Sequence, residues 1–338
     1  MSTTRLSDGL HLRLLTGACA ALLALAATPA ARAQVSVPQT YTVDRADDDD
    51  VRECTTGPND CTFRGALNKA LEGDIIVFDP TLFPQPPGPY DDVPDYPGPT
   101  VIQVLSPLPP ITFDVITVSG SSSTGPGVIL DGTLAGDGVS GLVIEGNDAF
   151  VRGIGFRNFG GDGVLVHGAR ATVGGTGDCT YGEPSRWIFA HSNGGYGVHV
   201  TGASAAGTRL DVMFIGEDED GAVVGNAAGG VLIDDGATDT RFSGGCFRVR
   251  GNHGPGVTIA GSTTTGTRVD SGDVGLLAEN NDGAGLWLDG APFDASVRIQ
   301  LRNNAGPGVL VTGGAENVRL SQGTITGNAD AGVRVEDG

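Results

Sequence analysis

The sequence predicts an all-β solenoid in which short strands from successive repeats stack on one another. Three observations predict it: a recurring phrase of Gly and aliphatic residues, alternation of apolar positions within that phrase, and an Asn at a fixed distance before it. Gly accounts for 56 of 338 residues and charged residues for 18%. Disordered chains can share such a composition, but they lack regularly placed apolar residues.

The phrase recurs eight times with a Gly before each apolar pair. The glycines are Gly141, Gly163, Gly197, Gly230, Gly256, Gly285, Gly308 and Gly332, at intervals of 22 to 34 residues. The first and third residues after each Gly are aliphatic in every repeat, from Leu142 and Ile144 to Val333 and Val335. The residue between them varies, which is the period-two pattern of a strand with one buried face.

A helix is excluded because its apolar stripe recurs every three and four residues. One short strand cannot bury its face alone, whereas a stack of equivalent strands can, and irregular intervals place loops at the corners. Ile259 is therefore expected to point inward and Thr258 outward to solvent.

An Asn precedes most of the phrases. Asn158 lies five residues before its Gly, and six others lie four residues before theirs: Asn193, Asn226, Asn252, Asn281, Asn304 and Asn328. Asn tolerates the left-handed conformation of a sharp corner, and stacked amides can hydrogen-bond from coil to coil. We expect a structural Asn ladder rather than catalytic residues.

These residues resemble the right-handed parallel β-helix repeats of the pectate-lyase-like superfamily. "DCTFRGALNKALEGDIIVFDP" (60–80) resembles the CSLREA region of secreted bacterial β-helix proteins: Cys61, Arg64 and Ala66 match that motif, while 62, 63 and 65 depart from it. The resemblance covers residues 40–338 and implies a right-handed parallel β-helix. It implies a CSLREA-like cap region at 34–79 and repeats at 80–338, with a Pro-rich excursion at 80–110.

The first 33 residues are expected to be a signal peptide. A basic start, an apolar Ala/Leu stretch and the small residues at 31–33 form the usual cleavage pattern, and the stretch is short for a membrane span. The mature chain has 17 basic and 39 acidic residues, a net charge of −22. We therefore expect a secreted or surface protein with no membrane span and no nucleic-acid partner.

The segment 62–73 reads as a short helix with Thr62 as its cap and Gly73 at its end, positioned to close the N-terminal end of the solenoid. Cys54 and Cys61 enclose a short loop beside it, and export favours a disulfide between them. Cys179 and Cys246 each lie sixteen residues after the Gly of their repeat, on coils two apart, and whether they pair stays open.

Calcium is the one cofactor considered. The run Asp47–Asp50 could bind calcium, although such runs are more often solvated loops. The acidic stretch 216–220 is also expected to be a solvated loop. No other cofactor is expected.

Catalysis in the resembled superfamily implies carboxylates at matching phases of adjacent coils. The positions after the predicted strands carry no acid on two consecutive coils, and Asp162 is the one acid before a Gly of the phrase. Asp234 and Asp235 follow their strand, the wrong phase for a hydrolase pair, and His253 is read as a loop residue.

His199 and Trp287 stand in the outward row, three coils apart, as candidate ligand-binding residues. The favoured function is a noncatalytic, surface-associated scaffold that binds polysaccharide weakly or contacts cell-surface components. The alternative is a polysaccharide lyase or glycoside hydrolase acting on an acidic or plant-type polysaccharide. Because the chain stops directly after a repeat strand, we also expect its end to continue or to be covered by a partner.

Overall fold

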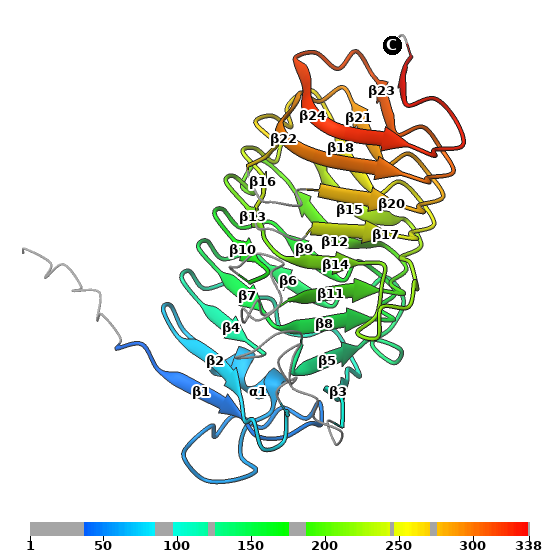
Figure 1. Cartoon of the computed structure of the whole chain (residues 1–338). Helices are drawn as coiled ribbons and strands as arrows, with labels where there is room; N and C mark the ends of the chain where they lie inside the picture. The colour runs from blue at the N-terminus through cyan, green and yellow to red at the C-terminus, as the bar shows by residue number, and fades with distance from the viewer. Residues whose placement is uncertain are drawn as a thin grey trace, which may run out of the picture. The chain divides into compact units, whose positions relative to one another are not determined.

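The computed structural model describes residues 37–84, 97–120, 126–175, 187–243, 247–270 and 276–336, without the side chains of 296 and 297. The predicted signal peptide, Cys179 and Cys246 lie outside these residues. The described chain is a parallel β-helix: one short helix and 25 strands, all of them in two parallel sheets. Figure 1 shows the coils stacked from β1 to β24.

The eight predicted strands form one eight-stranded parallel sheet. Its strands are β6 (Leu142–Ile144), β9 (Val164–Val166), β12 (Tyr196–Thr201), β15 (Gly229–Asp234), β18 (Val257–Ala260), β21 (Leu286–Asp289), β23 (Val309–Thr312) and β25 (Val333–Val335). Equivalent residues pair in register, so that Val198 lies beside Val231, and Val231 beside Val257. The prediction from the repeated phrase is confirmed for every strand of this sheet.

Alternation along these strands separates core from surface. The two aliphatic residues of each strand are buried from β6 to β23, including Ile259, whereas Val333 and Val335 of β25 are exposed. Thr258 occupies the outward row as predicted, but it is 3% exposed rather than solvated. It lies between the larger Leu232 and Trp287 of the neighbouring coils, and this corrects the expectation.

The remaining strands form a 17-stranded sheet that makes two rows along the stack. One row contains β1 (Thr40–Val43), β2 (Ile75–Phe78), β4 (Thr117–Ser119), β7 (Phe150–Arg152), β10 (Thr172–Val173), β13 (Arg209–Leu210), β16 (Arg241–Phe242) and β19 (Arg268–Val269). The other contains β3 (Thr100–Gln103), β5 (Val128–Asp131), β8 (Ile154–Arg157), β11 (Ile188–His191), β14 (Met213–Ile215), β17 (Phe247–Arg250) and β20 (Leu276–Glu279). The long strands β22 (Phe293–Arg302) and β24 (Val318–Thr326) pair within both rows.

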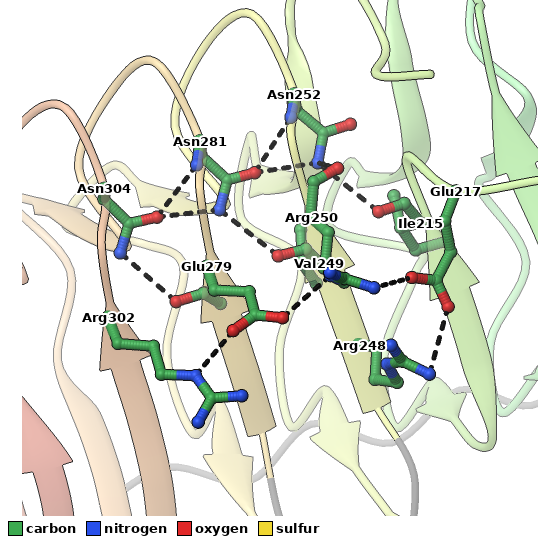
Figure 2. A network of polar contacts seen from close by, with 11 residues as sticks. Ile215, Glu217, Arg248, Val249, Arg250, Asn252, Glu279, Asn281, Arg302 and Asn304 are labelled. Atoms are coloured by element: carbon green, nitrogen blue, oxygen red, sulfur yellow. Dashed lines mark hydrogen bonds and ion pairs between the residues drawn. The ribbon is translucent and has the colours of Figure 1, made fainter. Parts of the chain in front are cut away.

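The Asn ladder is confirmed. From Asn193 to Asn304, each backbone N–H and each side-chain Nδ2 donates to the amide oxygen of the next ladder Asn, at 3.0–3.1 Å and 2.9 Å. Figure 2 shows Asn252, Asn281 and Asn304 in this row. The left-handed residue is the one before the ladder Asn, such as Ser192 or Asn280, and not the ladder Asn itself. Asn158 is left-handed in the same way and precedes Phe159, whose N–H donates to Asn193.

The N-terminal region carries the predicted helix and disulfide. Helix α1 (Phe63–Lys69) is capped by Thr62, which accepts from Gly65 N–H. It ends at Lys69, with Ala70 as its C-cap, rather than at Gly73. Its buried Phe63, Ala66 and Leu67 join the core that runs through the coils. Cys54 and Cys61 form the expected disulfide, with an S–S distance of 2.03 Å.

Candidate functional site

The predicted ligand residue His199 is held between two carboxylates. Its Nδ1 lies 3.1 Å from Asp162 Oδ2 and its Nε2 lies 3.0 Å from Asp234 Oδ1. His199 is on β12, while Asp162 precedes β9 and Asp234 ends β15, so the cluster joins three consecutive coils. Both ring nitrogens are therefore occupied by the chain itself.

Burial alone would lower the pKa of His199, but the hydrogen bonds and charges of Asp162 and Asp234 outweigh it and raise the pKa. Tyr196 lies beside the cluster, with its ring centroid 6.0 Å from that of His199. Burial and the same two carboxylates raise the pKa of the Tyr196 phenol. The cluster thus stabilises an imidazolium, which is a poor proton acceptor.

The sequence did not reveal this cluster because only equivalent positions of successive repeats were compared with one another. Asp162 lies before a strand and Asp234 at the end of one, 37 and 35 residues from His199. The strand β15 extends to Asp234, so only Asp235 follows it, although both come after the aliphatic pair as expected. The signal that could have revealed the cluster is His199 itself. It is a titratable residue in the middle of β12, where its side chain reaches carboxylates at the start of one neighbouring strand and at the end of the other.

Trp287 lies on the same outer face, on β21. Between it and β12 lie β15 and β18, which confirms the separation of three coils. Its Nε1 donates to Thr312 Oγ1 at 2.8 Å, and Thr312 Oγ1 donates to Asp289 Oδ1 at 2.9 Å. The ring is half-buried and fixed in orientation. His199 and Trp287 are not brought together into one site.

A second charged group lies on the outer face of β17, β20 and β22 (Figure 2). Arg250, Glu279 and Arg302 are in register there, and we call them the paired row. Glu279 lies 2.8 Å from Arg250 Nε and 2.5 Å from Arg302 Nε. Glu217, expected in a solvated loop, is instead buried and lies 2.7 Å from Arg250 and 3.3 Å from Arg248. The expectation failed because two arginines compensate the buried charge.

A third charged group lies on the outer face of β13, β16 and β19. Arg209, Arg241 and Arg268 are in register on three successive coils, and we call them the arginine row. Their side chains are 48%, 40% and 30% exposed. Like charges directly opposite one another in a sheet are destabilising, so this row costs stability.

The carboxylates around the arginine row satisfy it incompletely. Arg209 lies 3.6 Å from Asp211 and Arg241 3.6 Å from Asp270, both beyond good hydrogen-bond distance. Asp270 instead accepts from Arg268 Nε at 2.6 Å. Arg241 Nε is buried and has no hydrogen-bond partner among the described residues.

Asp211 directly follows β13, the strand that carries Arg209 of the arginine row, and it is almost fully buried. Burial raises the pKa of its carboxyl group, against the opposite effect of Ser243 and Arg209. Its Oδ1 accepts from Ser243 Oγ, while its Oδ2 has no hydrogen-bond partner in the described part of the chain. Partly unsatisfied donors and acceptors therefore gather on this strip, which is typical of a polar ligand site.

The run Asp47–Asp50 is largely occupied by arginines. Asp48 pairs with Arg64 at 2.6 Å, and Asp47 with Arg45 at 2.8 Å. In the described residues, no group of three or more His, Cys, Asp or Glu is arranged to hold a metal ion. Nor does any described helix have the length and apolar character needed to cross a membrane.

Comparisons with known proteins place the fold. Two solved structures match: the A-module of the Azotobacter vinelandii mannuronan C-5 epimerase AlgE6, and the pectate lyase Pel9A. The epimerase module has a TM-score of 0.52 and 17% sequence identity, and the match covers 88% of this chain and 69% of that chain. The pectate lyase has a TM-score of 0.52 and 15% sequence identity, and the match covers 90% of this chain and 78% of that chain. No family model and no curated protein matches. The chain is thus a parallel β-helix protein of the pectate-lyase-like fold.

Proposed function

We propose that this protein is a secreted, surface-associated β-helix that binds an acidic polysaccharide along Arg209, Arg241 and Arg268 without cleaving it. The observation that carries the proposal is a row of three like charges in register on an exposed face. A ligand with a carboxylate near each coil would offset the repulsion among the three guanidinium groups, which are 30–48% exposed. This replaces His199 and Trp287 as the main polysaccharide site.

The spacing of the row suits a polymer that runs along the stack. Successive coils lie about 4.8 Å apart, so the three guanidinium groups span about 10 Å. The planar guanidinium donates two parallel hydrogen bonds to a carboxylate, which gives specificity for uronates over uncharged sugars. Both matching structures come from proteins whose names refer to mannuronan or pectate, which supports an acidic polysaccharide as the ligand.

The noncatalytic part of the proposal rests on the groups along the strip. Cleavage needs an acid and a base within hydrogen-bond reach of one substrate bond. The described strands β13, β16 and β19 carry no His, Lys, Tyr or Cys. Asp211 is buried, and Asp270 is engaged by Arg268.

A polysaccharide lyase or hydrolase is the second candidate. The observation that favours it is Asp211, because a buried carboxyl group with a raised pKa beside an arginine is a common arrangement in catalytic sites. Both functions use the same face, so one experiment separates them.

The experiment measures binding and turnover together. Polygalacturonate, alginate and a neutral glucan are incubated with the chain, with and without calcium, while binding, unsaturated products and new reducing ends are followed. We expect binding of the uronates, no product, and at least tenfold weaker binding by Arg241→Gln.

Arg302→Gln is the matched control, because Arg302 is 41% exposed and Arg241 40% but Arg302 lies in the paired row. Equal binding of uronate and neutral glucan would overturn the proposal. Product formation that disappears in Asp211→Asn would establish the enzyme instead.

A further inference from the structure

The outer face of the eight-stranded sheet has a different charge from the arginine row. From β6 to β23, the strands and the two residues on each side of them contain no Lys or Arg. They contain five acids: Glu145, Asp162, Asp234, Asp235 and Asp289. Asp162 and Asp234 pair with His199, and the other three acids leave this face acidic, in contrast to the arginine row, so that it is suited to a cationic ligand.

The part of this face around β18 has the features of a built site. Thr258 and Ala260 are small residues, flanked by Leu232 on one coil and by Trp287 and Asp289 on the other. Thr258 Oγ1 is buried on the outward row and has no hydrogen-bond partner among the described residues. Asp289 lies in register with Ala260 on the next coil, whereas Asp234, on the preceding coil, is already held by His199 Nε2 at 3.0 Å.

Trp287 supplies a fixed platform next to these carboxylates. The bond from its Nε1 to Thr312, and from Thr312 to Asp289, orients ring and carboxylate together. A cation placed over an indole face is attracted by the ring quadrupole, and the neighbouring carboxylate strengthens this. The apolar face of a sugar ring packs on the same surface.

We propose that this face binds a polymer of protonated amino sugars, with one ring on Trp287, its ammonium group near Asp289, and a polar group of the sugar as the partner of Thr258 Oγ1. A basic peptide fits less well. The strands from β9 to β23 are paired on both sides, so a peptide main chain finds no free strand edge here. Recognition must come from side chains, as it does for a sugar.

The test compares glucosamine oligomers with their N-acetylated counterparts, at mildly acidic pH where the amines are protonated. Binding to the full chain is followed by calorimetry and by tryptophan fluorescence. We expect the amine oligomer to bind at least tenfold more tightly than the acetylated one. Trp287→Ala should abolish binding and Asp289→Asn should weaken it at least fivefold.

Thr258→Val keeps the shape of the side chain and removes only the hydroxyl. It should weaken binding of the amine oligomer without lowering the melting temperature, a result that a merely structural role would not give. Arg241→Gln, on the other face, should leave this binding unchanged. Equal affinity for both oligomers, undiminished binding by Asp289→Asn, or equally tight binding of an oligolysine peptide would overturn the proposal.

Discussion

Arg302 and Arg241 are equally exposed, at 41% and 40%, yet they stand in opposite electrostatic settings. In the paired row, Glu279 lies in register between Arg250 and Arg302, so charges alternate along the stack (Figure 2). In the arginine row, Arg241 lies in register between two further arginines. The same residue type at the same exposure therefore stabilises one face and strains the other.

The difference shows that register, rather than exposure, separates a structural arginine from one available to a ligand. Glu279 is nearly buried and reaches both neighbouring coils with its two oxygens. Asp270 is offset by two residues from Arg268 and gives Arg241 only a 3.6 Å contact. Four predictions break or sharpen this comparison, in order of decreasing effect on stability.

Glu279→Gln should have the largest effect. It removes a nearly buried carboxylate, leaves Arg302 without its partner and leaves Arg250 with Glu217 alone, which costs about 3–5 kcal/mol. Asp270→Asn, the matched change beside the arginine row, should cost less than about 1 kcal/mol because Asp270 is 31% exposed. Urea unfolding of both variants checks this, and equal losses would remove the distinction between the rows.

Asn252→Ala should cost about 2–3 kcal/mol. The ladder runs directly beside the paired row, and Asn252 Oδ1 accepts from both the backbone and the side chain of Asn226. Its loss leaves buried donors unsatisfied. Asn328→Ala, near the end of the ladder, should cost less because the bonds there are partly exposed. Hydrogen exchange at the corner amides reports the loss coil by coil, and identical protection in the two variants would contradict this.

How far the sequence could predict this depends on repetition. The phrase around Gly230 and Val231 recurs in eight coils, so the eight strands and the six ladder residues followed from spacing alone. Arg209, Arg241 and Arg268 lie on two-residue strands, and each follows a Thr and precedes an apolar residue, so this shorter repeat could also have revealed their register, but only the longer phrase was aligned.

The buried Glu217 was missed for a different reason: its partners Arg248 and Arg250 lie on another coil, more than 30 residues away along the chain. The acidic residues of a loop can be read from its own sequence, but the arginines that compensate their charge lie on another coil.

His199 reverses the charges of the paired row: it is a titratable cation between two carboxylates of neighbouring coils, whereas Glu279 is a carboxylate between two arginines. Its folded pKa is raised, so its contribution is complete below the unfolded value of about 6.5 and is lost as pH rises through the folded pKa. Relative to His199→Gln, the wild type should gain about 1–3 kcal/mol on the acidic side. Urea titrations of both chains across this range test it, and a difference that grows with rising pH would have the wrong sign.

Arg241→Glu should have the smallest effect on stability and the clearest effect on binding. The substitution converts the arginine row into the alternating pattern of the paired row, with a carboxylate in register between Arg209 and Arg268. Opposite charges in place of like charges across paired strands are worth about 0.2–1 kcal/mol, so the variant should be slightly more stable than the wild type.

The same carboxylate should repel a uronate polymer and occupy the two remaining arginines, so uronate binding should be lost. Melting temperature and binding measured on one preparation decide the matter. If the variant is destabilised by more than about 1 kcal/mol, Arg241 has a structural role. Its position in register between two arginines would then not mark it as available to a ligand.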